Sequence, residues 1–295
     1  MSTPRVAKRA AVSSGVRMAG NRDSFTIDAG ARLAGASDVG LRHRTNQDAL
    51  QLALAAAPGG GSERAGIVAL SDGVSSSKHS DLAATVAATA ASRQLAAATA
   101  GLPPRADAGA AAAAMVAAFL QAQTEVVKGA GPEPGDSWAC TLICALAFDT
   151  QVVVGNAGDS RCYWVPDDSS VETLLLSTDD SVVETQVRLG IRREIAENSS
   201  SAHAITKWLG PGAPSVIPSV QVHHLTAPGW LAVCSDGLWN YASAPQRFGA
   251  MLRTIAPRHA SSSDDAHQIA TKLIQWARER GGHDNITVAL LRTPW

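Results

Sequence analysis

Two aspartates of this chain each end a short apolar run and precede a glycine. Asp72 follows the run Ile67–Leu70, and Asp236 follows Trp230–Cys234, each behind a serine. A carboxylate at the end of a buried strand destabilises the fold unless something compensates its charge, and a metal ion is a common compensator. The glycine lets the backbone approach closely, so its carbonyl could reach the same ion. Either site taken alone is also explained by a simple Asp-Gly turn.

Three more aspartates stand where strands are expected to begin or end. Asp48 lies in Asn-Gln-Asp, Asp159 in Gly-Asp-Ser-Arg and Asp284 in His-Asp-Asn. Five acids placed in this way, over most of the chain, are hard to explain as turns, and they must converge within one domain to act together. Hard cations such as Mg²⁺ and Mn²⁺ take oxygen ligands, so the pattern predicts a site for one of them.

The composition limits the classes of partner. The chain has 295 residues and a formal net charge of −1. Its length allows one or two domains. The near-zero charge argues against a nucleic-acid partner, because proteins that bind nucleic acid carry a basic patch. We expect no membrane partner, since no stretch reads as long and apolar enough to cross a bilayer. The basic N-terminal residues precede no apolar run, which argues against a signal peptide.

Four cysteines lie within apolar, strand-like runs, and none has Cys-x-x-Cys spacing. Cys140 and Cys144 lie too far apart along one strand to form a disulfide easily. The others are Cys162 and Cys234. We interpret all four as reduced core thiols of a cytoplasmic protein.

Short apolar runs predict the strands. The run 140–148 is apolar at both alternating positions, so it needs cover on both faces, as two stacked sheets with outer helices would provide. Residues 1–28 lack such a pattern and are expected to form a disordered tail, with one domain over 29–295. The other expected strands cover 48–54, 67–70, 152–154, 161–165, 220–225, 230–234 and 286–291.

Three long helices are expected outside the sheets. The first is Ala-rich, which favours helix; it is capped by Ser80 with Asp81 and stopped by Gly101. The second runs from Asp107 to Gly129. The third runs from Asp264 to Arg280 and carries one apolar stripe.

Six short motifs occur in one order between residues 35 and 292. Each alone is weak, but together they are specific. The chain resembles the metal-dependent protein serine/threonine phosphatases of the PPM family, also called type 2C, and its bacterial members in particular. The resemblance implies an α+β fold, a four-layer αββα sandwich of two antiparallel sheets flanked by helices. The motifs are Ser37-Asp38-Val39-Gly40, Asn46-Gln47-Asp48, Ser71-Asp72-Gly73-Val74, Gly158-Asp159-Ser160-Arg161, Cys234-Ser235-Asp236-Gly237-Leu238 and Asp284-Asn285-Ile286-Thr287-Val288.

The resemblance also implies a centre of two Mn²⁺ or Mg²⁺ ions, with a third ion in bacterial members. Asp72 matches the acid that bridges the two ions, and the carbonyl of Gly73 matches a ligand of one of them. Asp236 and Asp284 match ligands of the other ion. Asp159 resembles the acid that holds the third, weaker ion.

The implied reaction is hydrolysis of phosphoserine and phosphothreonine. Two cations close together lower the pKa of a bridging water, so that hydroxide forms near neutral pH and attacks the phosphorus in line. The metals and an arginine neutralise charge on the phosphoryl oxygens. The expected partners are phosphorylated proteins, substrates of a Ser/Thr kinase, and the enzyme is expected to be a cytoplasmic monomer.

The chain departs from the family pattern in the first motif. The slot of the family's phosphate-binding arginine holds His43, flanked by Arg42 and Arg44. One of these arginines is expected to bind phosphate instead. Gln47 replaces a glutamate of eukaryotic members. Asp48 must then carry the local charge, as a direct metal ligand or through water.

Two segments have two open interpretations each. His79, in the loop after Asp72-Gly73, is either a general acid that protonates the leaving oxygen or a surface histidine. The segment 191–203 is either a flap that faces the substrate or a plain surface loop.

Two other functions fit parts of the pattern. A pseudophosphatase would use the same fold to hold a phosphorylated partner, and the displaced arginine favours it slightly. The intact Asp72, Asp236 and Asp284 oppose it, because converging acids without metal would repel one another. A two-metal hydrolase of small phosphoesters is the third hypothesis, but the sequence lacks the His/Asp clusters typical of such sites.

Overall fold

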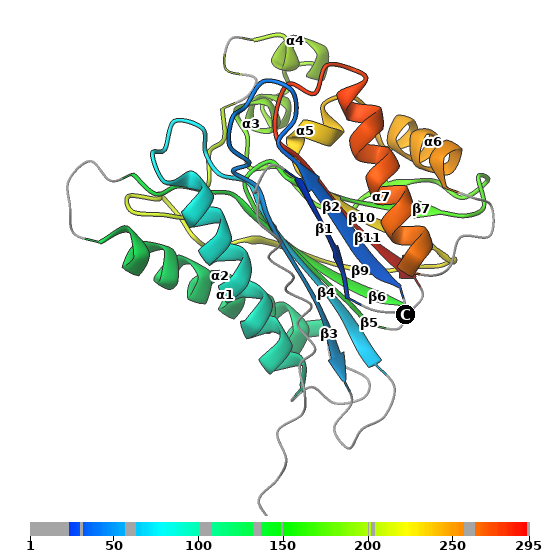
Figure 1. Cartoon of the computed structure of the whole chain (residues 1–295), viewed down its shortest axis with the longest axis horizontal. Coiled ribbons are helices and arrows are strands. Elements are labelled where there is room, and N and C mark those ends of the chain that lie inside the picture. The colour runs from blue at the N-terminus through cyan, green and yellow to red at the C-terminus, as the bar shows by residue number, and fades with distance from the viewer. Residues whose placement is uncertain are drawn as a thin grey trace, which may run out of the picture.

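Two antiparallel sheets face each other and carry helices on their outer sides in the computed structural model of the chain (Figure 1). The structure describes residues 24–29, 32–56, 63–100, 108–131, 137–148, 150–199, 201, 204–256 and 263–293. The strands are β1 (Ser24–Asp28), β2 (Leu33–Asp38), β3 (Ala49–Ala56), β4 (Glu63–Ser71), β5 (Leu142–Phe148), β6 (Gln151–Ala157), β7 (Arg161–Pro166), β8 (Leu174–Leu175), β9 (Ser219–His224), β10 (Gly229–Cys234) and β11 (Ile286–Thr293). The helices are α1 (Ser80–Ala100), α2 (Ala108–Ala130), α3 (Val182–Arg188), α4 (Arg193–Glu197), α5 (Asp236–Trp239), α6 (Pro245–Ile255) and α7 (Ser263–Arg278). The first sheet has the strand order β1-β2-β11-β10-β7-β8, and the second has the order β3-β4-β5-β6-β9.

Three apolar layers join the four layers of the sandwich. One lies between the second sheet and α1 with α2, one between the two sheets, and one between the first sheet and α6 with α7. Strand β4 contributes to two of them: Ile67 and Ala69 pack toward the helices, whereas Val68 and Leu70 pack between the sheets. The predicted four-layer αββα sandwich is confirmed, and it explains why strands such as β4 are apolar on both faces.

The strand register brings the acid-bearing segments to one end of the sandwich. In the first sheet Cys234, at the end of β10, pairs with Val288 of β11 and with Arg161 of β7. In the second sheet Ser71, at the end of β4, pairs with Ala49 at the start of β3. Since neighbouring antiparallel strands run in opposite directions, the end of one meets the start of the next. Residues just outside these strand ends are therefore neighbours in space although they are far apart in sequence.

The folded domain begins earlier than the sequence predicts. Strand β1 pairs antiparallel with β2 along its whole length, and Phe25 and Ile27 pack against the layer between the sheets. The prediction of a disordered tail was therefore wrong for residues 24–28. A five-residue strand at the edge of a sheet shows only two alternating apolar residues, which is too short a pattern to recognise. Residues 1–23 lie outside the described residues, and a tail over them stays a prediction.

The long helices lie close to their predicted bounds. Helix α1 begins at Ser80 and has Asp81 in its first turn, where an acid stabilises a helix. Helix α2 ends one residue beyond the expected Gly129, and α7 agrees with the expected third helix to within two residues. The expected stop at Gly101 and the expected start at Asp107 lie outside the described residues.

Helix α2 corrects one expectation. By length and composition alone, this helix of the described chain could cross a membrane, so the expectation that no stretch is long and apolar enough was wrong. In the structure Met115, Phe119 and Val126 are fully buried in the layer between α2 and the second sheet. The apolar character of α2 therefore serves the core of a folded domain.

Candidate active site

Five aspartates from both sheets gather at the end of the sandwich where these strands meet. Asp48 precedes β3, Asp72 follows β4, and Asp159 lies between β6 and β7. Asp236 begins α5, and Asp284 lies just before β11. Burial raises the pKa of Asp72 well above its usual value, and the negative charges of the other four acids raise it further. The structure thus places the other four acids named from the sequence within electrostatic reach of Asp72.

Asp48 is the most deeply buried of the five acids, with 6% of its surface exposed. Its Oδ2 accepts hydrogen bonds from Ser235 Oγ at 2.9 Å and from Thr287 Oγ1 at 2.6 Å. Its Oδ1 is buried and has no hydrogen-bond partner among the described residues. Burial raises the pKa of Asp48 to about 7, although the two hydrogen bonds lower it. A buried oxygen without a partner is unusual, and a bound water or ion is one explanation for it.

The Asp72-Gly73 turn is held by β5 on one side and by α1 on the other. The backbone N–H of Asp72 donates to Thr141 Oγ1 at 3.0 Å, and the N–H of Thr141 donates to the Asp72 carbonyl at 2.7 Å. Gly73 forms a β-bridge with Cys140. A Cβ atom on Gly73 would lie 2.8 Å from the backbone of Ser80. Only glycine therefore fits here without displacing the start of α1.

Asp159 lies in the turn between β6 and β7 and is tied to α5. Its backbone carbonyl accepts a hydrogen bond from Trp239 Nε1 at 2.9 Å. Burial raises the pKa of Asp159, and the charges of Asp236 and Asp179 raise it further. A cavity of about 200 Å³ opens beside Asp159, and residues of α3 and α4 form part of its wall.

Asp284 stands at the open rim of the acid cluster, with 41% of its side chain exposed. Its Oδ1 lies 3.3 Å from His43 Nε2 and accepts a hydrogen bond from the backbone N–H of Asn285 at 2.8 Å. His43, which occupies the slot of the family's arginine, therefore contacts one of the predicted metal ligands. Arg42 and Arg44 flank it with exposed side chains.

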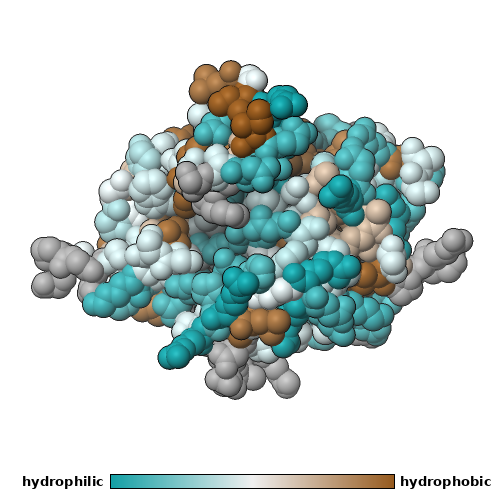
Figure 2. Space-filling view, turned by 90° about the horizontal axis from the view of Figure 1, so that it is seen from above, coloured by the Kyte–Doolittle hydropathy of each residue, from teal (hydrophilic) through white to brown (hydrophobic). Residues whose placement is uncertain are grey.

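Two interpretations still apply to His79, and two to the segment 191–203. His79 is half-buried, and its ring centroid lies 6.3 Å from that of Trp138. Helix α4 forms the middle of the segment 191–203, and Leu189, just before it, is 78% exposed. Figure 2 looks onto this end of the molecule and shows several separate brown groups on a mostly teal and white surface. The roles of His79 and of this segment stay predictions.

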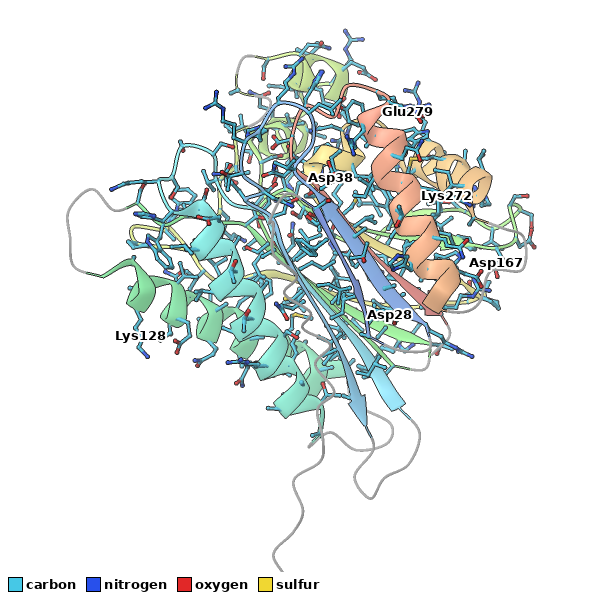
Figure 3. The ribbon with its side chains drawn as sticks, viewed as in Figure 1. Asp28, Asp38, Lys128, Asp167, Lys272 and Glu279 are labelled. Carbon is cyan, nitrogen blue, oxygen red and sulfur yellow. The ribbon has the colours of Figure 1, made fainter. Side chains whose placement is uncertain are left out.

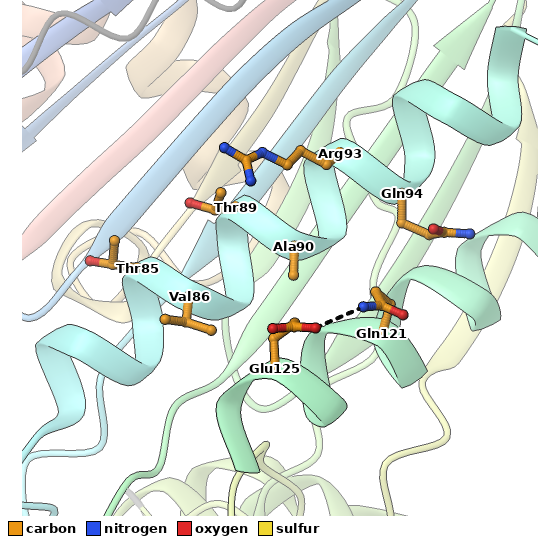
Figure 4. A pocket seen from close by; sticks show the side chains of 8 residues that line it. All are labelled: Thr85, Val86, Thr89, Ala90, Arg93, Gln94, Gln121 and Glu125. Atoms are coloured by element: carbon orange, nitrogen blue, oxygen red, sulfur yellow. Dashed lines mark hydrogen bonds between the residues drawn. The ribbon is translucent and has the colours of Figure 1, made fainter. Parts of the chain in front are cut away.

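A separate groove of about 730 Å³ lies between α1 and α2, away from the acids (Figure 4). No residue named as a site residue from the sequence lines it. Its polar groups include the pair Gln121 and Glu125, joined by a hydrogen bond of 3.1 Å, and Arg93. The acids, and not this wider hollow, carry the groups that could do chemistry.

The donor atoms of the acid cluster suit a hard divalent cation. They are carboxylate and backbone carbonyl oxygens, which Mg²⁺ and Mn²⁺ prefer. Among the described residues, no three His, Cys, Asp or Glu side chains already lie close enough to hold a metal ion between them. A cation bound here would have to draw these carboxylates closer together than the structure places them. The unpartnered Oδ1 of Asp48 fits this interpretation.

Four residues have functions at the site that the sequence analysis missed. Ser235 and Thr287 bind the Asp48 carboxylate. Asn285 holds the loop before β3, because its Oδ1 accepts a hydrogen bond from the Gln47 backbone N–H at 2.7 Å. Trp239 binds the Asp159 carbonyl. All four stand within three residues of Asp236 or Asp284, so the motifs were a signal of their importance, but not of what they bind.

Known proteins resemble this chain in sequence and in fold. The sequence profile of the family described as Protein phosphatase 2C matches residues 39–276. The serine/threonine phosphatase stp of Listeria innocua is 33% identical over 152 residues, which are 51% of this chain and 55% of that protein. The match thus spans about half the length of this curated relative.

Solved structures share the fold over nearly their whole length. The serine/threonine phosphatase Stp1 from Staphylococcus aureus superimposes with a TM-score of 0.70 at 21% identity, covering 91% of this chain and 98% of that one. The catalytic domain of the serine/threonine protein phosphatase PstP, solved with two manganese ions, superimposes with a TM-score of 0.61 at 25% identity, covering 89% of this chain and 98% of that one.

Proposed function

The chain belongs to the protein phosphatase 2C family, and on this basis we propose that it is a metal-dependent enzyme that hydrolyses phosphoserine and phosphothreonine in proteins. The curated relative described above is a serine/threonine phosphatase, and one structural relative was solved with manganese. The five acids gathered at one end of the sandwich support the same activity, because phosphoryl transfer depends on positive charge held at a fixed place.

The observation that carries the proposal is the gathering of five acids at one end of the sandwich. Asp48 keeps one buried oxygen without a partner, and Asp72 faces four other carboxylates. Such a cluster is unfavourable in a protein that binds nothing there, since burial and like charges both oppose ionisation. A pseudophosphatase without metal would retain this penalty with no benefit.

We assign the metal ligands as the family resemblance implies. Asp72, Asp236 and Asp284 would hold two Mn²⁺ or Mg²⁺ ions together with the carbonyl of Gly73, and Asp159 would hold a third. When bound, these ions supply hydroxide near neutral pH and positive charge for the phosphoryl oxygens.

Asp48 is proposed to act as the fixed acid at the floor of the site. Ser235 and Thr287 both donate to its Oδ2, so they set the orientation of the carboxylate and favour its ionised form. Its Oδ1 is then left to face a cation directly or through water.

The loop before Asp48 is proposed to bind the phosphoryl group. Arg42 and Arg44 have exposed side chains, whereas His43 contacts Asp284. We therefore expect Arg42→Ala or Arg44→Ala to raise KM for a phosphothreonine peptide with little change in kcat, because each would weaken ground-state and transition-state binding alike. An unchanged KM in both variants would place the phosphate-binding group elsewhere.

The substrates are proposed to be phosphorylated proteins that a Ser/Thr kinase produces, and the setting is proposed to be cytoplasmic. The four cysteines are free and buried, which suits a reducing compartment. Burial also raises the pKa of Cys140 to about 12, so this thiol would not form the thiolate needed for a cysteine nucleophile.

The test compares p-nitrophenyl phosphate with a phosphothreonine peptide, each with Mn²⁺, Mg²⁺ or EDTA. The proposal predicts turnover of both substrates with metal and none with EDTA. No turnover by folded protein with any metal would favour the pseudophosphatase. Turnover of the small ester alone would favour a hydrolase of small phosphoesters.

A further inference from the structure

Arg161 is a buried arginine at the start of β7 to which the proposed function gives no task. Only 5% of its surface is exposed. Its Nε and Nη2 both donate to the Asp179 carboxylate, with the Nη2–Oδ2 distance at 2.7 Å. Its Nη1 donates to the Ser243 carbonyl at 3.1 Å and to Tyr163 Oη at 3.2 Å. A planar guanidinium held by three partners is fixed in place, as a flexible lysine ammonium would not be.

The flat face of this guanidinium lies on Trp239. Arg161 Cζ is 3.6 Å from the ring centroid, a distance at which cation and ring attract each other. Trp239 is the last residue of α5, the helix that Asp236 begins. Its Nε1 donates to the Asp159 carbonyl. Arg161 therefore supports the side chain that connects the segments carrying Asp236 and Asp159.

A second set of contacts runs from Arg161 to the Gly158-Asp159 turn through Asp179. The next residue, Asp180, donates its backbone N–H to the Gly158 carbonyl at 2.7 Å. The Gly158 N–H lies 3.4 Å from Asp180 Oδ2. Since Arg161 holds Asp179, it also keeps Asp180 where it can bind the turn.

We propose that Arg161 is a positioning residue: it fixes the separation of the Asp159 and Asp236 carboxylates and thereby sets how tightly a divalent cation is held there. The route through Trp239 ends at the backbone of Asp159. The route through Asp179 ends at the backbone of Gly158, the residue before it. The inference rests on the proposed function for the presence of the cation. Groups that orient metal ligands typically change affinity by about 10- to 100-fold when they are altered.

The chain contains a matched control at the other end of the sandwich. Arg292 of β11 also binds an aspartate through two nitrogens, with Nη1 at 2.7 Å from Asp167 Oδ1. It also lies over a tryptophan, with Cζ 5.3 Å from the ring centroid of Trp230. Figure 3 shows Asp167 well away from Asp38, which ends β2 at the acid-bearing end. This second cluster joins the same types of side chain, but it is more exposed and lies away from the five site acids.

The test measures Mn²⁺ binding by isothermal titration calorimetry on the full chain after treatment with EDTA and its removal. Arg161→Lys keeps the charge but loses the bidentate contact and the stacking. Trp239→Phe keeps an aromatic ring, though a smaller one, but loses the N–H that donates to the Asp159 carbonyl. Both variants are expected to raise the Kd for Mn²⁺ about tenfold or more. Arg292→Lys is expected to bind Mn²⁺ as the parent does.

Thermal unfolding in EDTA separates positioning from a general loss of structure. Both arginine variants are expected to lower Tm, but only Arg161→Lys should weaken Mn²⁺ binding by the folded protein. If Arg161→Lys does not fold, Trp239→Phe carries the test. Parental Mn²⁺ affinity in these folded variants overturns the inference, as does an equal loss in Arg292→Lys or a parent that binds no Mn²⁺. A parent that binds Mn²⁺ but hydrolyses no phosphopeptide refutes the proposed function alone.

Discussion

Ser71-Asp72-Gly73 ends a strand of the second sheet, and Ser235-Asp236-Gly237 ends a strand of the first. The two serines bind different groups: Ser71 Oγ donates to the Thr141 carbonyl, whereas Ser235 Oγ donates to the Asp48 carboxylate. The first serine thus joins neighbouring strands, and the second orients an acid that comes from the other sheet.

The chain also leaves the two strands differently. After Asp72 it enters a loop that leads to α1, whereas Asp236 is itself the first residue of α5. A Cβ atom on Gly73 would lie 2.8 Å from the Ser80 backbone, and one on Gly237 would lie 2.0 Å from the Asn285 carbonyl oxygen. In both segments the Ser-Asp-Gly sequence places an acid at the end of a strand. The contacts of the serine and of the glycine differ, because the neighbouring residues differ.

The largest predicted effect is the same for the two Ser-Asp-Gly segments. Asp72→Ala and Asp236→Ala are each expected to lower kcat for a phosphopeptide by more than about a hundredfold, since each removes negative charge that would hold a cation. Steady-state kinetics with Mn²⁺ checks this, with the exposed Asp168 changed to Ala as the control. Retained activity in either site variant would contradict its assignment as a metal ligand.

Asp48, to which Ser235 of the second segment donates, should make the stability of the metal-free protein depend on pH. Its pKa is raised to about 7 in the fold, so without metal the folded protein binds a proton there that the unfolded chain releases near pH 4. The free energy of unfolding in EDTA is therefore expected to fall as pH rises from about 4 to 7, by up to a few kcal/mol. Urea titrations check this, and Asp48→Asn should reduce the slope. If the free energy of unfolding rises between about pH 4 and 7 in the parent but not in Asp48→Asn, the account is contradicted.

Substitution of the two glycines by alanine should lower the free energy of unfolding by different amounts. Gly237→Ala forces a Cβ against a backbone carbonyl and is expected to lower stability by about 3 kcal/mol, whereas Gly73→Ala should lower it by about 1 kcal/mol. Urea unfolding in EDTA at one pH provides the comparison. Equal losses would show that the shorter contact at Gly237 relaxes without penalty.

The smallest predicted effect distinguishes the roles of the two serines most directly. Ser235→Ala removes a donor to a buried carboxylate, so the pKa of Asp48 should rise further and the activity profile should shift to higher pH. Ser71→Ala should lower stability by about 1 kcal/mol and leave the profile in place. The pH dependence of kcat/KM distinguishes them, and an identical profile for both variants would remove the distinction.

The sequence predicted two stacked sheets with outer helices because the run 140–148, which includes β5, is apolar at both alternating positions. It named the acids because each stands at a strand end. It could not predict what binds Asp48. Ser235 and Thr287 lie 187 and 239 residues away from it in the chain, and only the register of β10 and β11 brings them together. The contact between His43 and Asp284 was out of reach for the same reason.

The central claim is that acids from two sheets together hold divalent cations. The most direct measurement is Mn²⁺ binding, by electron paramagnetic resonance, to the metal-free parent and to Asp72→Ala and Asp236→Ala. The account predicts that the parent binds at least two ions per chain and that each variant, still folded, loses binding. A parent that binds no Mn²⁺, or variants from either sheet that bind as the parent does, would contradict it.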